Sequence, residues 1–394
     1  MTMILGRPVN LNLSNWRDYP QSKWSFQHVM EVLPTAAIKT TNSSRAVSLA
    51  NDLNGLNDLS FSLDQLEIKN APLELFLEKS WTDAFMVTHN GKTIGSWQAP
   101  DMDVSNPHLL FSVSKSITAT VAGILQDRGL LDCTAPVAAY LDIPERSAYA
   151  DCTVQHVLDM AVALAFEENY TSGAHAYSQY RMASGWNPVD QTQPVQGLRE
   201  FIFSLVKNED EHGHQFRYRS PNSDLLGMIL ASAGGRPFEE LMSELLWIPM
   251  EATADAYITL DYYGEARTAG GICATISDLT RLGQLICDDG RSQSGHQVLS
   301  SRWISEILNG GSRDAWLKGD LAYVLPEGNY RNKWYQLGNQ DNAVCAMGIH
   351  GQYLYINPKR NVVISRLACQ PLPVDDPVEG ALLKAMTNIA EQFG

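Results

Sequence analysis

The stretch 111-FSVSKSITATVAGILQDRGLL-131 decides the fold that we predict for this chain. From Ile117 its apolar residues recur at helical spacing, and Gly129 stands where such a helix would end. Ser112 and Lys115 are three residues apart, which places both side chains on one face of a helix. The stretch therefore predicts a helix whose first turn pairs a serine with a lysine.

A serine hydroxyl becomes a useful nucleophile only when a base takes its proton. Lys115 can be that base if burial lowers its pKa, and the residues at 111, 113 and 117 supply apolar surroundings. At a helix start the backbone N–H of Ser112 has no intrahelical partner and can face a developing oxyanion. The pair is therefore a candidate for nucleophilic catalysis.

The same spacing occurs a second time, at Ser204 and Lys207. This copy lies late in a predicted helix, before the acidic loop 208-NEDEHGH-214, so we interpret Lys207 as a solvated helix-end charge. Because the spacing recurs, the local pattern alone leaves two interpretations of Ser112 open: a reactive serine, or a polar helix start.

Strand patterns occur near both ends of the chain, and helical patterns fill the middle. Residues 84–98 predict a β-hairpin around the turn pair Asn90-Gly91, and residues 353–368 predict two further strands. Residues 1–60, rich in Pro, Asn and Ser, predict an irregular, extended arm over a core. Helices are predicted at 153–164, 197–207, 276–290 and 378–393, and residues 220–247 predict two helices around the Gly234-Gly235 turn.

Composition excludes several classes of function. The chain has 394 residues and a formal net charge of -15, without a basic stripe, so we expect no nucleic-acid partner. Six cysteines are scattered without a C-x-x-C pair, and His212 and His214 lie in a charged loop, so we predict no metal and no cofactor. Without a signal-peptide pattern or a long apolar run, we expect a cytoplasmic protein that does not bind membranes.

Four stretches resemble the signatures of the serine β-lactamase and penicillin-binding-protein superfamily. The opening stretch resembles the first signature, and 216-FRYRSPNSDLLGMIL-230 resembles the second, a tyrosine followed two residues on by Ser or Asn. The stretch 268-TAGGICATISDLTRLGQLICDDG-290 is similar to the Gly-Gly helix of the class C branch, and 348-GIHGQYLYINP-358 to the strand turn after the third signature. Within this superfamily WTDAF, HLLFSVSKS, VLDM, SGW, GGS and GIHGQ resemble the 6-aminohexanoate-dimer hydrolases.

The resemblance implies a β-lactamase-like fold of the α/β plus all-α class. Residues 1–120 and 270–394 would form an α/β domain, with an antiparallel sheet flanked by helices, built from both chain termini. Residues 121–269 would form an inserted helical domain, with the active site in the cleft between the two.

The resemblance also assigns catalytic roles. Ser112 would be the nucleophile, Lys115 and Tyr218 would move its proton, and the N–H groups of Ser112 and Ile349 would form the oxyanion hole. A lysine ammonium beside a tyrosine can lower the pKa of the phenol, so we expect a lowered pKa for Tyr218.

These roles imply a serine hydrolase for short-chain carboxylic esters, with linear amides as a further substrate class. The alternatives are a β-lactam-reactive or DD-peptidase-like enzyme and a non-catalytic binding protein. In the third signature a cation and a hydroxyl are replaced by Ala346 and Met347, and only Gly348 remains, which weighs against the β-lactam alternative.

Residues expected at the small-molecule substrate follow from the same resemblance. Arg181 stands where the efficient dimer hydrolases carry an acidic residue, and it should disfavour a substrate ammonium if it faces the cleft. Ala269 stands where they carry Asn. The full set of expected substrate-binding residues is Tyr170, Arg181, Trp186, Ala269, Gly348 and His350. A homodimer is a further expectation.

Overall fold

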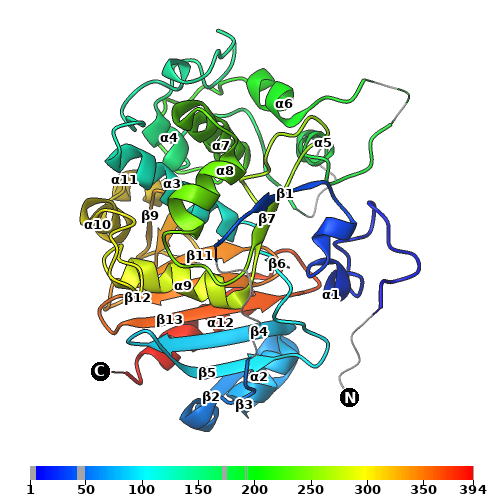
Figure 1. Cartoon of the computed structure of the whole chain (residues 1–394), viewed down its shortest axis with the longest axis vertical. Helices are drawn as coiled ribbons and strands as arrows, with labels where there is room; N and C mark the ends of the chain where they lie inside the picture. Colours follow the sequence, from blue (N-terminus) through cyan, green and yellow to red (C-terminus); the bar gives the residue numbers. More distant parts are fainter. Residues whose placement is uncertain (1–5, 42–48, 171–174, 191, 193, 394) are drawn as a thin grey trace.

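The computed structural model describes residues 6–41, 49–170, 175–190, 192 and 194–393 (Figure 1). Its main feature in this part of the chain is a seven-stranded sheet in which all neighbours are antiparallel. In order across the sheet the strands are β5 (Lys92–Gln98), β4 (Thr82–His89), β13 (Val362–Ala368), β12 (Gln352–Asn357), β11 (Val344–Gly348), β10 (Trp334–Gln336) and β9 (Asn329–Arg331). Segments from both ends of the chain thus share one sheet, as the sequence predicts.

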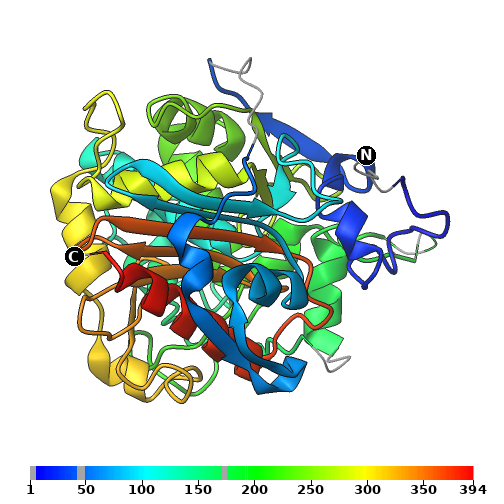
Figure 2. The ribbon, with the colours of Figure 1, turned by 90° about the horizontal axis from the view of Figure 1, so that it is seen from below.

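Helices cover both faces of this sheet. Helix α9 (Ile276–Cys287) packs on one face, and a Cβ added at Gly283 would lie 2.4 Å from the side chain of Val363. Helix α12 (Asp376–Ala390) lies on the opposite face with α2 (Leu73–Lys79), which Figure 2 shows from below. The predicted hairpin is confirmed, because β4 and β5 are joined at Asn90-Gly91, where both residues have positive φ.

A smaller, four-stranded antiparallel sheet has the order β1 (Thr35–Ile38), β7 (Ala256–Thr259), β8 (Ile272–Ala274) and β6 (His108–Leu109). Strand β1 belongs to the stretch predicted as an irregular arm, so that prediction is wrong for these residues, which become a strand by pairing with β7. Strands β2 (Ser60–Leu63) and β3 (Ile68–Pro72) form a separate hairpin. The domain bounds at 120 and 270 stay a prediction.

The bounds of the other α-helices of the described residues are as follows. They are α1 (Ser22–Ser25), α3 (Val113–Asp127), α4 (Val154–Leu158), α5 (His175–Ala183), α6 (Leu198–Ser204), α7 (Pro221–Gly234), α8 (Phe238–Met242), α10 (Ser301–Asn309) and α11 (Arg313–Leu317). Short 3₁₀ turns occur at Val29–Glu31, Asn54–Asp58, Asp64–Leu66 and Val137–Ala139, and a π-helical turn at Ser243–Trp247.

Two predicted helices are shorter in the structure. The helix predicted at 153–164 ends at Leu158, because Met160 has a left-handed backbone with φ of 55°. The helix predicted at 197–207 ends at Ser204, where the backbone becomes extended at Leu205. None of the described helices is long and apolar enough to cross a membrane. The expected cytoplasmic location and homodimer stay predictions.

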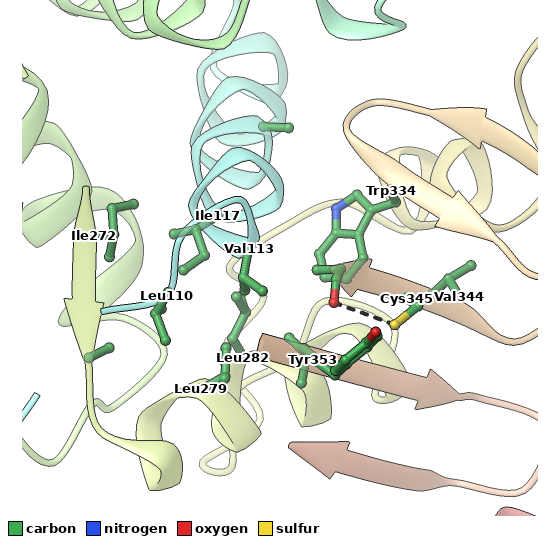
Figure 3. Packing of buried hydrophobic residues seen from close by; sticks show 14 of the residues in the cluster. Leu110, Val113, Ile117, Ile272, Leu279, Leu282, Trp334, Val344, Cys345 and Tyr353 are labelled. Atoms are coloured by element: carbon green, nitrogen blue, oxygen red, sulfur yellow. Dashed lines mark hydrogen bonds between the residues drawn. The ribbon is translucent and has the colours of Figure 1, made fainter. Parts of the chain in front are cut away.

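Helix α3 lies in the middle of the hydrophobic core and is buried from Val113 to Leu125. Figure 3 shows its first turns, with Val113 and Ile117 pointing toward apolar side chains of α9 and β8. The start of α3 therefore lies where both sheets and the helical part meet, and this position determines the surroundings of Ser112.

Candidate active site

Ser112 lies at the turn from β6 into α3. It is the N-cap residue of the helix, and its neighbour Phe111 has a φ of 45°, which is unusual for a bulky residue. The turn leaves Ser112 9% exposed. Because the first turn of a helix has no intrahelical acceptors for its N–H groups, the backbone N–H of Ser112 is available to a ligand oxygen.

Lys115 contacts the hydroxyl of Ser112 directly. Its Nζ donates to Ser112 Oγ at 2.8 Å and to the carbonyl of Ala269 at 2.6 Å, and the residue is only 2% exposed. Burial lowers the pKa of Lys115 to about 7, although the nearby carboxylate of Glu168 opposes the shift. A fraction of the Lys115 side chains is therefore neutral near pH 7, and a neutral amine can accept a proton from serine.

Tyr218 completes the group around Ser112 Oγ. The side chains of Ser112 and Tyr335 interact with its hydroxyl and act to lower its pKa, and Lys115 Nζ lies 5.1 Å from the centre of its ring. The expected lowering of the Tyr218 pKa is wrong, because burial raises the pKa and outweighs any effect of the lysine. Tyr218 is therefore a neutral phenol near pH 7, and its hydroxyl carries a proton that it could donate.

Glu168 is a residue that our sequence reasoning missed. Its carboxylate accepts hydrogen bonds from Ser220 Oγ at 2.6 Å and from Tyr170 at 2.5 Å, and also from the backbone N–H of Ser220. Its charge also raises the pKa of Lys115 more than any other carboxylate does. No sequence signal separates Glu168 from its exposed neighbour Glu167, since only the fold turns one of them inward.

Asp224, on α7, was also missed. Its carboxylate accepts from the backbone N–H of Ala269 at 2.7 Å, from Tyr180 at 2.5 Å and from Arg267. This buried ion pair holds the segment before Gly270, so that the carbonyl of Ala269 faces Lys115. The backbone of Ala269 thus contacts Lys115, and the expected contact of Ala269 with the substrate stays a prediction.

Strand β11 ends close to Ser112. A Cβ added at Gly348 would lie 2.7 Å from the carbonyl oxygen of Leu110 and 3.1 Å from the backbone N of Ser112, so only glycine permits this approach. The next residue, Ile349, lines the cavities on both sides of Ser112. The geometry thus places the strand end, and with it the backbone of Ile349, beside the N–H of Ser112.

Two cavities meet at Ser112. The first measures about 500 Å³, and the second measures about 220 Å³. Both are lined by Ser112, Tyr170 and Ile349. Of the site residues predicted from the sequence, the larger cavity is also lined by Lys115, Arg181, Trp186, Ala269 and His350. The smaller cavity is also lined by Tyr218 and Gly348.

Comparison with known proteins is consistent with this geometry. A family model described as Beta-lactamase matches residues 78–387. The chain belongs to the beta-lactamase family. It is 32% identical over 361 residues to the 6-aminohexanoate-dimer hydrolase of Paenarthrobacter ureafaciens, covering 92% of this chain and 88% of that protein.

Solved structures of beta-lactamase family proteins share the fold. One, from Bacillus anthracis and assigned as a 6-aminohexanoate-dimer hydrolase, superposes with a TM-score of 0.86 at 23% identity and covers 98% of both chains. A family VIII carboxylesterase gives a TM-score of 0.58 at 14% identity, covering 80% of this chain and 94% of its own. The predicted β-lactamase-like fold is confirmed, and this family member is a hydrolase.

Within this beta-lactamase family site, His350 and Trp186 form walls. His350 is 5% exposed, its Nδ1 is hydrogen bonded to the carbonyl of Gln370 at 2.7 Å, and burial lowers its pKa to about 4. Its imidazole is therefore neutral at pH 7. Trp186 is 4% exposed and donates from Nε1 to Thr259 at 3.1 Å.

The second Ser-x-x-Lys copy has different surroundings. Lys207 forms an ion pair with Asp151 at 3.0 Å, and the hydrogen bond to Asp151 raises its pKa and outweighs the opposite effect of burial. Asp151 also contacts His212 at 2.8 Å. Among the described residues, no cluster of three His, Cys, Asp or Glu side chains could hold a metal ion.

Proposed function

We propose that the chain is a serine hydrolase that cleaves short-chain carboxylic esters and linear amides through an acyl-enzyme on Ser112. The observation that carries this proposal is the 2.8 Å contact between Ser112 Oγ and a buried lysine whose pKa is about 7. A serine with a neutral amine as its base is the combination that acyl transfer needs.

The reaction begins when neutral Lys115 takes the hydroxyl proton as Ser112 Oγ attacks the substrate carbonyl carbon. The carbonyl π electrons move to its oxygen, which accepts hydrogen bonds from the N–H groups of Ser112 and Ile349. Collapse of this intermediate expels the alcohol or amine and leaves an ester on Ser112.

The leaving atom needs a proton, and two groups can deliver it. Lys115, now an ammonium, contacts Ser112 Oγ, and the Tyr218 hydroxyl interacts with the Ser112 side chain, so both groups lie near the leaving atom. Tyr218 passes on a proton as a neutral phenol and regains one from Lys115. Water then attacks the acyl-enzyme by the same steps in reverse, releasing the acid and restoring Ser112.

Linear amides are included because of the 32% identical relative, whose name describes cleavage of the 6-aminohexanoate dimer. β-Lactam chemistry is disfavoured, because Ala346 and Met347 on β11 provide neither a cation nor a hydroxyl for a substrate carboxylate.

The test is labelling with a fluorophosphonate probe together with turnover of p-nitrophenyl acetate. We expect the probe to modify Ser112, and Ser112→Ala to lower kcat by about 10³-fold or more. Ser204→Ala is the matched control, since Ser204 shares the spacing but lies on α6 beside a solvated lysine. Labelling at another residue, or full turnover by Ser112→Ala, would refute the proposal.

A further inference from the structure

The larger cavity beside Ser112 is lined by two arginines, Arg17 and Arg181, that form no ion pair with a carboxylate of the described residues. Among the described residues, Arg17 donates to the side-chain oxygen of Asn187, and its guanidinium carbon lies 5.2 Å from the ring centre of Trp16. The guanidinium carbon of Arg181 lies 4.8 Å from the ring centre of Tyr177. Arg181 Nε is buried without a hydrogen-bond partner in the part of the chain that the structure describes.

The other charged groups of this cavity do not neutralise the two arginines. Arg267 forms an ion pair with the buried carboxylate of Asp224, so these two charges compensate each other. Asp18 is exposed at the rim, where solvent and salt screen its charge. Burial lowers the pKa of Arg17 to about 10, and the like charge of Arg181 adds to that shift. An anion between the two guanidinium groups would relieve this repulsion.

The smaller cavity on the other side of Ser112 has the opposite character. It is lined by tyrosines and aliphatic side chains, and its charged residues are Asp376 and Glu379. Burial raises the pKa of Glu379 to about 7, as expected for a carboxylate in apolar surroundings. A substrate anion is therefore repelled from this end of the cleft and attracted to the end that contains the arginines.

We propose that Arg17 and Arg181 bind a carboxylate at one end of the substrate, so that the enzyme prefers acidic esters and amides, such as half-esters of dicarboxylic acids. This inference rests on the proposed serine hydrolase function. Guanidinium groups bind carboxylates through paired, charge-assisted hydrogen bonds, and their flat faces can stay on the aromatic rings meanwhile. A substrate ammonium would meet two like charges and is disfavoured.

The first experiment compares kcat/KM for matched esters. Mono-p-nitrophenyl glutarate is anionic, p-nitrophenyl valerate is neutral, and p-nitrophenyl 5-aminovalerate is cationic. A second series, 4-acetoxybenzoate against 4-acetoxybenzamide, places the carboxylate on the leaving half. We expect the anionic ester to be preferred by about tenfold or more in one series, and the preference to weaken as salt is raised.

Variants then test the residues. Arg17→Gln and Arg181→Gln should each reduce the ratio of anionic to neutral turnover, and the double variant should bring it to about one. Arg199→Gln is the matched control, because Arg199 is half-exposed, paired with Glu265 and outside both cavities at Ser112. Its ratio should equal that of the unaltered enzyme.

A binding readout separates this inference from the catalytic proposal. Arg17 lies over the rings of Trp16 and Trp186, so anion binding should change tryptophan fluorescence. Adipate should give a saturable change of tryptophan fluorescence in Ser112→Ala. It should give no such change in a variant that carries Ser112→Ala together with Arg17→Gln and Arg181→Gln.

Equal turnover of anionic and neutral esters in both series, or a preference that survives in the double arginine variant, overturns the inference. Absence of Ser112 labelling refutes the serine mechanism instead.

Discussion

Lys115 has its chemical properties because of where it is buried. In water its ammonium would hold its proton far above neutral pH, and loss of solvation is the main cause that lowers its pKa to about 7. Glu168 acts in the opposite direction, since a carboxylate stabilises the ammonium form. The two effects together set the pH at which Lys115 can serve as a base.

The pH dependence of kcat/KM should therefore have an acid limb near pH 7. Activity requires neutral Lys115 in the free enzyme, so kcat/KM should be low below this pH and rise through it. Glu168→Gln removes a charge that raises the pKa of Lys115, so the limb should move to lower pH, by about half a unit or more. The measurement is kcat/KM for p-nitrophenyl acetate between pH 5 and 9, a range of roughly two units either side of the limb.

Glu167→Gln is the control for that shift. It removes the same charge one residue earlier, from an exposed side chain that does not affect the pKa of Lys115. Its limb should coincide with that of the unaltered enzyme. A limb that moves to higher pH in Glu168→Gln would contradict the assignment of Lys115 as the base.

At the scale of elements, the site depends on how closely β11 approaches the start of α3. These two elements come from opposite ends of the chain, and they meet where Gly348 faces the backbone of Leu110 and Ser112. Backbone groups hold the oxyanion in the proposed reaction, so the distance between strand and helix matters more than the side chain of Ile349.

Gly348→Ala should consequently impair catalysis. Its Cβ would lie 2.7 Å from the carbonyl oxygen of Leu110, so the strand end must move away from Ser112. We expect kcat/KM to fall by about 10²-fold, because one oxyanion donor is displaced. Steady-state hydrolysis of p-nitrophenyl acetate measures the effect.

Gly380→Ala is the contrasting variant. Gly380 lies inside α12, and a Cβ there would meet no atom within 4 Å. Alanine should stabilise the helix by about 0.5–1 kcal/mol and leave kcat/KM unchanged. If Gly348→Ala kept full activity, the close approach of β11 would not be needed for catalysis.

At the scale of the whole molecule, the N-terminal arm helps to build the cleft. Trp16 is fully buried, donates from Nε1 to the carbonyl of Trp186 at 3.1 Å and contacts that ring edge-on at 5.3 Å between centres. Arg17 lies in the same arm. The arm is thus a wall of the larger cavity as well as a cover for the core.

Trp16→Ala should test this role. Removing a fully buried indole should lower the free energy of unfolding by about 3–5 kcal/mol, measured in urea, and should reduce kcat/KM because Trp186 loses its support. Val9→Ala in the same arm is the control, since Val9 is fully exposed and should change neither quantity. A loss below about 1 kcal/mol for Trp16→Ala would show that the arm is dispensable.

Much of the fold could be predicted from local patterns. The hairpin of β4 and β5 follows from two strand-like runs on either side of the Asn90-Gly91 turn, and α3 follows from helical spacing. The errors arose where a distant partner overrides local preference, as at β1, which is a strand only because it pairs with β7. Helix α4 was predicted too long for a similar reason, since the apolar residues after Leu158 are buried in irregular backbone.

The sequence by itself determined that Ser112 and Lys115 are a candidate reactive pair, because they are neighbours on one turn of a helix wherever that helix packs. The sequence motifs also indicated the family. The tertiary structure alone decided that this copy differs from Ser204 and Lys207, because only packing removes water from a lysine and changes its pKa. It also decided the roles of Glu168, Asp224 and Arg17, since these reach the site from segments far apart in the chain, and spacing carries no information about contacts at such separations.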